Sequence, residues 1–344
     1  MNFWKKLNKP FLCLAPMADV TDCAFREIIA KYGKPDVFWT EFVSADGLAH
    51  EKARRKLLIG LKYSKKEHPI VAQIFGSNPE NIKRAATLCK KLKFDGIDIN
   101  MGCPDRSIEK QHSGAAMIKD LVLAKKIIKS AKEGAGGLPV SVKTRIGYSK
   151  DETETWIRGL LEEKLPALTI HLRTRKEMSK APAHWEFMKR IIRLRDEISP
   201  DTLIIGNGDV ADIRDAKEKA KKYGCDGVML GRAIFGNPWL FKRSPSEFFI
   251  PEGPTATLPG SAKGAGRKNL EGRSFTKEKL KIMLEHTKLF EKYLGKHKSF
   301  AVMKKHFKAY ANGFDGAKEL RMKLMETKNT REVEKIVKNF LKSL

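Results

Sequence analysis

Gly96-Ile97-Asp98-Ile99-Asn100-Met101-Gly102-Cys103-Pro104 is the stretch that decides the fold of this chain. Its first half is a short apolar run with the composition of a buried strand, and its second half is a glycine-proline turn. Helical spacing precedes it at 79–92 and follows it at 121–132, and a second apolar run comes at 140–144. This alternation of strand and helix is typical of a parallel α/β sheet.

The same alternation extends in both directions to about residue 240. Two further segments have helical spacing, 154–164 and 211–223, and helix starts are indicated by Ser77-Asn78-Pro79, by Ser149 with Asp151, and by Asp209. Eight candidate strands occur in all, at 11–15, 37–40, 70–74, 96–100, 140–144, 168–171, 203–206 and 227–230. Eight strand–helix units predict a (β/α)8 TIM barrel, with a doubly wound open sheet as the alternative.

The composition changes after the last of these units. We expect a barrel domain at 1–245, a proline- and glycine-rich linker or inserted loop at 246–275, and a small C-terminal helical bundle at 276–344. The bundle holds 18 lysines and arginines against 8 acidic residues, a surplus of 10 positive charges.

The net charge of the 344-residue chain is +27, which favours a nucleic-acid partner first and a membrane surface second. The alternative is that the proteins of the source organism are generally basic, in which case the charge does not indicate a partner. The five cysteines form no C-x-x-C pair, so we expect no metal site and a reducing, cytoplasmic environment. We expect neither a signal peptide nor a membrane span, because no stretch approaches the roughly 20 apolar residues of a span.

A barrel carries its active site at the carboxyl ends of its strands, so the polar residues there are the candidates. Gly231-Arg232 opens a helical stretch after the eighth strand, and Gly206-Asn207-Gly208-Asp209 follows the seventh. Backbone N–H groups at a helix start, together with an arginine, make a phosphate site. The alternative is a pair of ordinary turns in which glycine is needed for its backbone freedom.

Three other strand ends carry reactive side chains. Lys143 could extend its ammonium group to water and have no functional role, or it could stabilise negative charge on a reduced cofactor ring. His171 could be a core histidine or a ligand. Cys103, held in a Gly-Cys-Pro turn, could be a proton donor, a nucleophile or only a small turn residue.

Taken together, several motifs in the right order resemble the dihydrouridine synthase family. The matching stretches are Leu14-Ala15-Pro16-Met17-Ala18-Asp19-Val20-Thr21-Asp22 with Phe25-Arg26, Gln73-Ile74-Phe75-Gly76, Asp98-Ile99-Asn100-Met101-Gly102-Cys103-Pro104, Val142-Lys143-Thr144-Arg145, His171 with Arg173-Thr174-Arg175, Gly206-Asn207-Gly208-Asp209-Val210, Gly231-Arg232-Ala233 and, weakly, Met303-Lys304-Lys305-His306.

The resemblance implies an enzyme that reduces uridine in tRNA to dihydrouridine, with FMN at the barrel mouth and NADPH (or NADH) as reductant. It implies that hydride passes from the flavin to C6 of uracil and that Cys103 gives the proton to C5. Flavin ring contacts would come from Pro16, Met17, Gln73, Lys143 and His171, and phosphate contacts from Asn207, Gly208, Gly231 and Arg232. Asp209 would be a further cofactor-binding residue. Substrate contacts would come from Asn100, Arg145, Arg173 and Arg175. FMN is expected rather than FAD because no G-x-G-x-x-G fingerprint follows a strand.

The chain also departs from the family pattern. Leu172 stands where the family usually has glycine, the segment 176–183 is unlike the common one, and 253–273 looks inserted. The competing hypotheses are a dihydroorotate dehydrogenase-like FMN barrel acting on a small pyrimidine, and a non-catalytic tRNA-binding protein. We expect a cytoplasmic monomer whose basic helical domain binds tRNA and which does not bind membranes.

Overall fold

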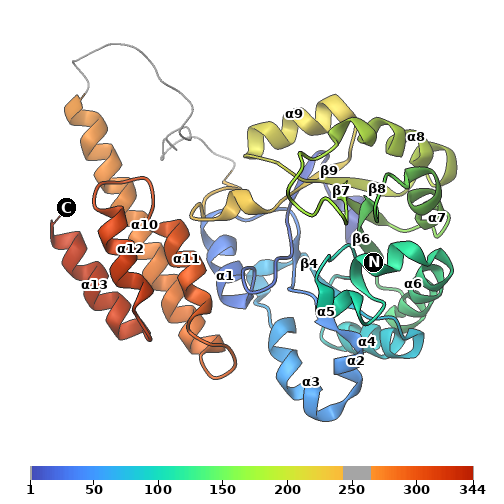
Figure 1. Cartoon of the computed structure of the whole chain (residues 1–344), viewed down its shortest axis with the longest axis horizontal. Helices are drawn as coiled ribbons and strands as arrows, with labels where there is room; N and C mark the ends of the chain where they lie inside the picture. Colours follow the sequence, from blue (N-terminus) through green and yellow to red (C-terminus); the bar gives the residue numbers. More distant parts are fainter. Residues whose placement is uncertain (1, 243–264, 344) are drawn as a thin grey trace. The chain divides into compact units, whose positions relative to one another are not determined.

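The computed structural model describes residues 2–242 and 265–343 (Figure 1). The chain divides into two compact units, Met1–Glu27 with Pro35–Ala233 and Ile28–Lys34 with Ile234–Leu344. The first unit therefore ends near Ala233, earlier than the boundary at 245 that was expected from composition. Among the described residues, no helix has the length and apolar character that crossing a membrane requires.

The first unit is built on one parallel sheet, and every strand predicted from the sequence is present in it. The hydrogen-bonded order is β1-β9-β8-β7-β6-β5-β4-β2, and a bridge between Cys13 and Val37 closes the circle from β1 to β2. The barrel prediction is thus confirmed over the open sheet. The strands are β1 Phe11–Leu14, β2 Phe38–Trp39, β3 Val43–Ser44, β4 Ile70–Phe75, β5 Gly96–Met101, β6 Val140–Gly147, β7 Ala167–Thr174, β8 Leu203–Asn207 and β9 Gly227–Leu230, where β3 is an extra pair of residues beside β4.

Helices lie around the strands of the first unit (Figure 1). These helices are α1 Cys23–Tyr32, α2 Ala45–Ala49, α3 Glu51–Leu57, α4 Pro79–Lys91, α5 Arg106–Glu109, α6 Leu121–Ala135, α7 Arg158–Leu161, α8 Met188–Ile198 and α9 Ile213–Tyr223. Asn78 caps α4 as predicted, because its side chain accepts from the N–H groups of Glu80 and Asn81 at 3.0 and 3.1 Å.

Two helix predictions need correction. Asp212, not Asp209, caps α9 by accepting from Asp215 N–H at 2.8 Å, while Asp209 has a left-handed backbone with φ 44°. The helix predicted at 154–164 is a π-helical turn, Thr153–Ile157, followed by α7, and it ends early. Lys164, with φ 48°, already has a left-handed backbone, which no right-handed helix can include.

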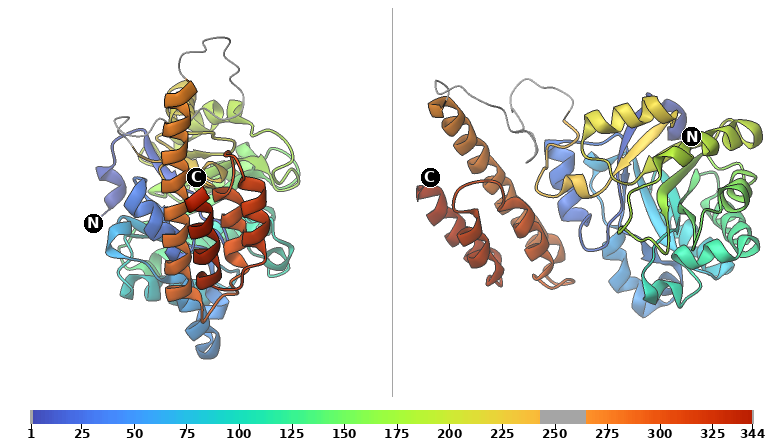
Figure 2. Two further views of the ribbon diagram at one scale, coloured as in Figure 1. Left: turned by 90° about the vertical axis from the view of Figure 1, so that its left-hand side faces the viewer. Right: turned by 45° about the horizontal axis from the view of Figure 1, so that its top comes forward.

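In its described C-terminal part, residues 265–343, the second unit contains the helices α10 Ala265–Leu294, α11 Val302–Tyr310, α12 Ala317–Met325 and α13 Thr330–Ser343. They lie side by side, coloured orange to red in both views of Figure 2. Buried residues four apart, such as Met303 with Phe307 and Val333 with Val337, put one apolar face of each helix inward.

The predicted linker at 246–275 differs from the structure over its last part. The helix α10 begins at Ala265, so residues 265–275 are helical. Gly266 and Gly272 suggested a loop, but an isolated glycine costs a helix only about 1 kcal/mol and does not stop one of this length. The rest of the predicted linker, 246–264, lies outside the described residues, as does most of the insertion expected at 253–273.

The barrel interior changes from apolar to polar along its axis. Alternate residues of a strand face the same side, so one face of β6 presents Ser141, Lys143 and Arg145 in turn. Towards the amino ends of the strands the interior is filled by apolar side chains, with Trp4 beneath them at 2% exposure. The apolar cluster consists of Trp4, Phe11, Cys13, Ala15, Val37, Trp39, Val71, Ala167, Ile205 and Met229, of which Ala15 and Met229 reach the carboxyl ends of their strands. The polar positions therefore collect at the carboxyl end.

A buried ion pair holds the loop that follows β1. Arg26 Nε donates to Glu67 Oε2 at 2.6 Å, and the two side chains are 1% and 0% exposed. The guanidinium also donates to the carbonyls of Thr21 and Lys62 at 2.7 and 2.6 Å. The Thr21 hydroxyl in turn accepts from the N–H of Met17 at 2.9 Å. Arg26 thus connects the Met17 loop to the segment before β4.

Replacing Arg26 with methionine should lower the free energy of unfolding of the barrel by about 3–5 kcal/mol, because Glu67 would remain buried without its partner. Denaturant unfolding followed by tryptophan fluorescence measures this loss. Arg55→Met is the matched control, since Arg55 is 79% exposed in its pair with Glu51 and such pairs contribute no more than about 0.5 kcal/mol. Equal losses in the two variants would contradict a structural role for the buried pair.

Candidate active site

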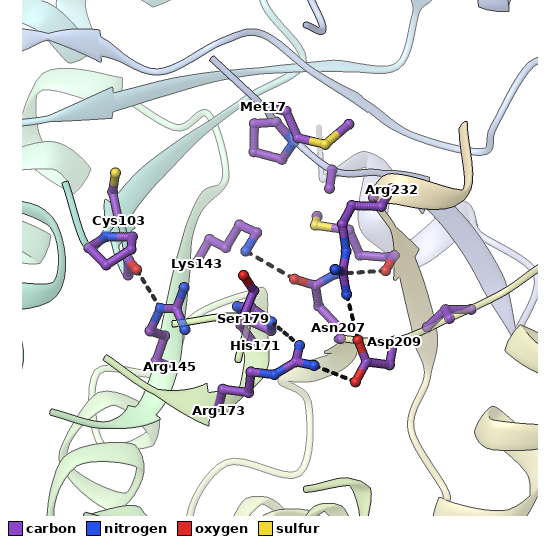
Figure 3. A pocket seen from close by; sticks show the side chains of 18 of the residues that line it. Met17, Cys103, Lys143, Arg145, His171, Arg173, Ser179, Asn207, Asp209 and Arg232 are labelled. Atoms are coloured by element: carbon purple, nitrogen blue, oxygen red, sulfur yellow. Dashed lines mark hydrogen bonds and ion pairs between the residues drawn. The ribbon is translucent and has the colours of Figure 1, made fainter. Parts of the chain in front are cut away.

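A cavity of about 720 Å³ opens at the carboxyl ends of the barrel strands (Figure 3). Its volume is in the range of roughly 300–1,000 Å³ that small-molecule sites occupy. Nearly all the predicted site residues line it, namely Pro16, Met17, Gln73, Asn100, Cys103, Lys143, Arg145, His171, Arg173, Asn207, Gly208, Asp209, Gly231 and Arg232. Residues from separate strand ends thus meet in one site.

Two amides on one side of the cavity are hydrogen-bonded to each other and to a buried carboxylate behind them. Gln73 is fully buried, and its Nε2 donates to Asp98 Oδ2 at 2.7 Å while its Oε1 accepts from Asn100 Nδ2 at 3.2 Å. Ser141 Oγ donates to the other oxygen of Asp98 at 2.6 Å. Burial raises the pKa of Asp98 to about 6. Asp98 was not predicted, although it faces inward two positions before Asn100.

The Cys103 turn is ordered by its neighbours. Asn100 Oδ1 accepts from the N–H groups of Gly102 and Cys103 at 3.1 and 2.9 Å, and Arg145 Nε donates to the Gly102 carbonyl at 2.8 Å. Cys103 is half-buried, whereas the other four cysteines are buried. Burial is also the main reason why the pKa of the Cys103 thiol is raised. The thiol is therefore held in its protonated form at neutral pH.

Lys143 points its ammonium into the cavity rather than out to water. Its Nζ donates to Asn207 Oδ1 at 3.3 Å, and Asn207 Nδ2 donates to the Met229 carbonyl at 2.8 Å. Burial, with a further contribution from the positive charge of Arg145, lowers the pKa of Lys143 to about 8. A desolvated ammonium of this kind interacts strongly with an anion that enters the site.

Figure 3 shows Arg173 between His171 and Asp209. Arg173 Nη1 lies 3.1 Å from His171 Nε2, and its Nη2 pairs with Asp209 Oδ2. Burial, together with the surrounding cations, holds the pKa of His171 well below its usual value. His171 is therefore neutral, and because the guanidinium can only donate, Nε2 accepts and Nδ1 carries the proton.

The turns after β8 and β9 bring Asp209 and Arg232 together. Asp209 Oδ1 accepts from Arg232 Nη2 at 2.7 Å, so this carboxylate lies between two guanidinium groups. Gly208 has φ 123°, and a Cβ there would come within 2.8 Å of the Ala183 Cβ. Four cationic side chains and one carboxylate line the cavity, so its charge suits an anionic ligand.

Arg175 is the one predicted site residue that does not line the cavity. Its guanidinium pairs with Glu109 and lies 5.5 Å from the centre of the Tyr148 ring. Arg173 does line the cavity, but its donors are shared among His171, Asp209 and the Ala181 carbonyl.

Sequence reasoning missed several lining residues. Phe42 lies just beyond β2 and could have been found by examining that strand end, whereas Ser179 comes from an irregular loop and has no recognisable signal. Met229 lies on a strand, and the remaining missed residues lie within two positions of a predicted residue in the chain. The full set is Ala15, Phe42, Gly102, Pro104, Ser179, Val210, Ala211, Met229 and Ala233.

The sequence model described as "Dihydrouridine synthase (Dus)" matches residues 13–344. The chain belongs to the dihydrouridine synthase family. Its relatives in the family include the "Probable tRNA-dihydrouridine synthase" of Staphylococcus aureus strain Mu50, 41% identical over 98% of this chain and 95% of that protein. "Probable tRNA-dihydrouridine synthase 2" of Bacillus subtilis strain 168 is 40% identical over 98% of this chain and 96% of that protein. The family resemblance inferred from the motifs is confirmed.

Solved structures resemble the fold at low identity. 6-Hydroxypseudooxynicotine amine oxidase from Pseudomonas geniculata N1 is 12% identical with a TM-score of 0.50, over 67% of this chain and 46% of that longer one. Morphinone reductase in complex with tetrahydroNAD is 14% identical with a TM-score of 0.48, over 69% of this chain and 87% of the other. At these identities the likeness concerns only the fold.

The pKa of Lys143 has a measurable effect on stability. Between pH 8 and 10.5 the unfolded chain binds a proton that the folded chain does not, so the lysine makes the free energy of unfolding rise with pH across this window. The free energy of unfolding of the wild type minus that of Lys143→Met should increase by about 3 kcal/mol over it, because the buried charged lysine destabilises the folded chain at the low end of the window. Denaturant unfolding of the ligand-free proteins at several pH values tests this. Parallel pH curves would mean that Lys143 is ordinarily solvated.

Proposed function

We propose that the chain is a tRNA-dihydrouridine synthase, which reduces the C5=C6 bond of uridine in tRNA with FMN as resident flavin and NADPH (or NADH) as reductant. One observation carries the proposal: a protonated thiol, a desolvated lysine and paired amides line one cavity in a chain of this family. A dihydroorotate dehydrogenase-like enzyme would share the barrel but would not need a net charge of +27. A non-catalytic tRNA-binding protein would need neither the thiol nor the lysine.

The residues of the cavity fit FMN by the chemistry of their donors. Ala15, Met17 and Met229 offer an apolar surface for a flat ring, and Gln73, Lys143 and His171 offer polar groups for its edge. A Cβ at Gly231 would lie 3.7 Å from the Ala15 Cβ and 3.8 Å from the Met17 sulfur, at ordinary contact distance, so Gly231 borders the same apolar surface. Asn207, Gly208, Asp209 and Arg232 would hold the phosphate end, Asp209 through its pair with Arg232. When bound and reduced, FMN supplies the hydride for C6 of uracil.

Of the roles that the sequence left open for Cys103, its environment favours the proton donor. Its raised pKa keeps the thiol protonated, which suits a general acid and disfavours a nucleophilic thiolate. Hydride addition at C6 leaves negative charge spread over C5 and O4, and the thiol would quench it by protonating C5. Asn100 and Arg145 both hold the Cys103 turn and both line the cavity, so they would lie beside the base.

A uracil within folded tRNA must leave its base stack to reach this cavity. The helical unit would bind the phosphate backbone of the tRNA. Arg331, Lys335 and Lys342 are exposed on α13 and border one surface depression, which presents a basic face. The proposal takes the enzyme as a monomer that acts in the cytoplasm.

The flavin released from the purified protein should be FMN, identified by mass spectrometry. Arg232→Ala should weaken its retention by about 1.5–3 kcal/mol through loss of a charge-assisted phosphate contact. Arg158→Ala, a change on an outer helix in an exposed pair with Glu154, is the control and should retain FMN normally. Release of FAD, or of no flavin, would contradict the proposal.

Cys103→Ala should keep bound FMN and its reduction by NADPH but lose most of the rate at which tRNA reoxidises the flavin. A positioned general acid contributes about 10²–10⁴-fold. Stopped-flow absorbance with unmodified tRNA measures that rate, and Cys103→Ser should be nearly as slow because a hydroxyl is a weaker acid. Cys89→Ala, at a buried cysteine on α4, is the control. A rate for Cys103→Ala within a few-fold of wild type would exclude the thiol from the chemistry.

Replacing Arg331, Lys335 and Lys342 together with alanine should weaken tRNA binding and reduce its salt dependence, because fewer counterions are released. Flavin reduction by NADPH should stay unchanged. Binding isotherms at several salt concentrations provide the measurement. The control replaces Lys126 and Lys129, which are exposed on α6. Equal effects of the two sets would contradict a specific role for α13.

A further inference from the structure

The Cys103 turn has two limbs, residues 100–102 before the cysteine and residues 104–109 after it, and different elements hold them. The limb before the cysteine is fixed by Asn100 on β5 and by Arg145 on β6. The limb after it runs through Pro104 into α5, which spans only Arg106–Glu109. A helix of one turn has little stability of its own. The orientation of this second limb therefore depends on what α5 contacts.

Ile108 of α5 is buried, and the Cys103 carbonyl accepts from the N–H of Ala115 at 2.9 Å. Arg175 adds a charged contact at the last residue of α5. Its Nε lies 2.9 Å from each carboxylate oxygen of Glu109, and its Nη2 also pairs with Glu109. A weaker bond of 3.5 Å joins Nη2 to the Pro104 carbonyl, directly after Cys103. The two side chains are only 22% and 11% exposed, so this is not a freely solvated surface pair. Two-pronged pairing also constrains direction, because the guanidinium fork matches the carboxylate plane.

Arg175 is itself anchored to the barrel. Its N–H donates to the Gly147 carbonyl at 2.9 Å, just beyond the pairing of Gly147 with Thr174 between β6 and β7. Its guanidinium lies 5.5 Å from the centre of the Tyr148 ring, and Lys176 N–H donates to the Tyr148 carbonyl at 2.9 Å. The ion pair thus connects α5 to the ends of two strands.

We propose that Arg175 is a positioning residue: with Glu109 it forms a brace that holds the second limb of the Cys103 turn and so directs the thiol into the cavity. The inference rests on the proposed function for the meaning of that direction. It replaces the role in substrate binding that was expected for Arg175, whose guanidinium lies outside the cavity and is occupied by Glu109.

The reactivity of the Cys103 thiol tests the brace without tRNA or NADPH. Cys13, Cys23, Cys89 and Cys225 are buried, so iodoacetamide added to the purified full-length protein should modify Cys103 selectively. Arg175→Met and Glu109→Gln should each raise the rate of Cys103 alkylation about tenfold, because the turn opens more often. Peptide mass spectrometry assigns the site, and unchanged alkylation of the four buried cysteines shows that the barrel remains folded.

Matched variants separate a brace from general loss of stability. Arg84→Met removes an exposed arginine from its pair with Glu80 on α4 and should leave the alkylation rate at the wild-type value. Exchanging the partners, Arg175→Glu with Glu109→Arg, should restore slow alkylation towards wild type. Arg175→Lys should fall between, because lysine keeps the charge but not the fork.

Wild-type alkylation in both Arg175→Met and Glu109→Gln would overturn the brace, whether or not tRNA reduction is lost. Faster alkylation in both, reversed by the exchange, would establish it. The proposed function is tested separately, because a wild-type protein that fails to reduce tRNA would refute that function and leave the alkylation result standing.

Discussion

Parallel pairing of eight strands around one closed circle brings all their carboxyl ends to the same rim. Every other feature of the site depends on this constraint. Side chains alternate between the interior and the helices, so a polar residue at an inward position near a strand end has no place except the barrel mouth. β6 illustrates it: Ser141 is buried beside Asp98, Lys143 reaches Asn207, and Arg145 holds the Cys103 turn.

The same geometry concentrates positive charge in a partly desolvated cavity. Burial lowers the pKa of Lys143 to about 8 and keeps His171 neutral, because the surrounding protein leaves less water to stabilise their charged forms. Asp209 offsets part of the charge by pairing with Arg173 and Arg232. The remaining excess is a standing attraction for an anionic ligand, and it exists before any ligand arrives. Electrostatic preorganisation of this kind is effective because the protein need not rearrange when charge develops.

Arginine serves this site in two distinct ways. Arg232 is exposed and available to a ligand, whereas Arg145 and Arg173 use most of their donors on backbone carbonyls and neighbouring side chains. The forked guanidinium suits the second use, since it can join several loops at fixed angles. These residues therefore shape the cavity that they also line, and a change at one of them alters the cavity wall as well as its charge.

The eight strands, their order along the chain and 14 of the 23 residues that line the cavity could be predicted from the sequence. Apolar runs, turn residues and strand ends are local signals, and barrel closure then places them together. Arg175 and Asp209 show where this reasoning fails. Arg175 follows a strand end as a substrate-binding residue would, yet Glu109, far away in the chain, occupies its guanidinium. Asp209 resembles a helix cap, yet Asp212 caps α9 and Asp209 pairs with two arginines.

The sequence by itself therefore determined which residues reach the barrel mouth. The two-residue period of a strand and the turn residues that end it can both be recognised from residues that are neighbours in the chain. Only the tertiary structure decided which of them face the cavity and which hold its walls, because that depends on the reach of long side chains between loops that are distant in sequence.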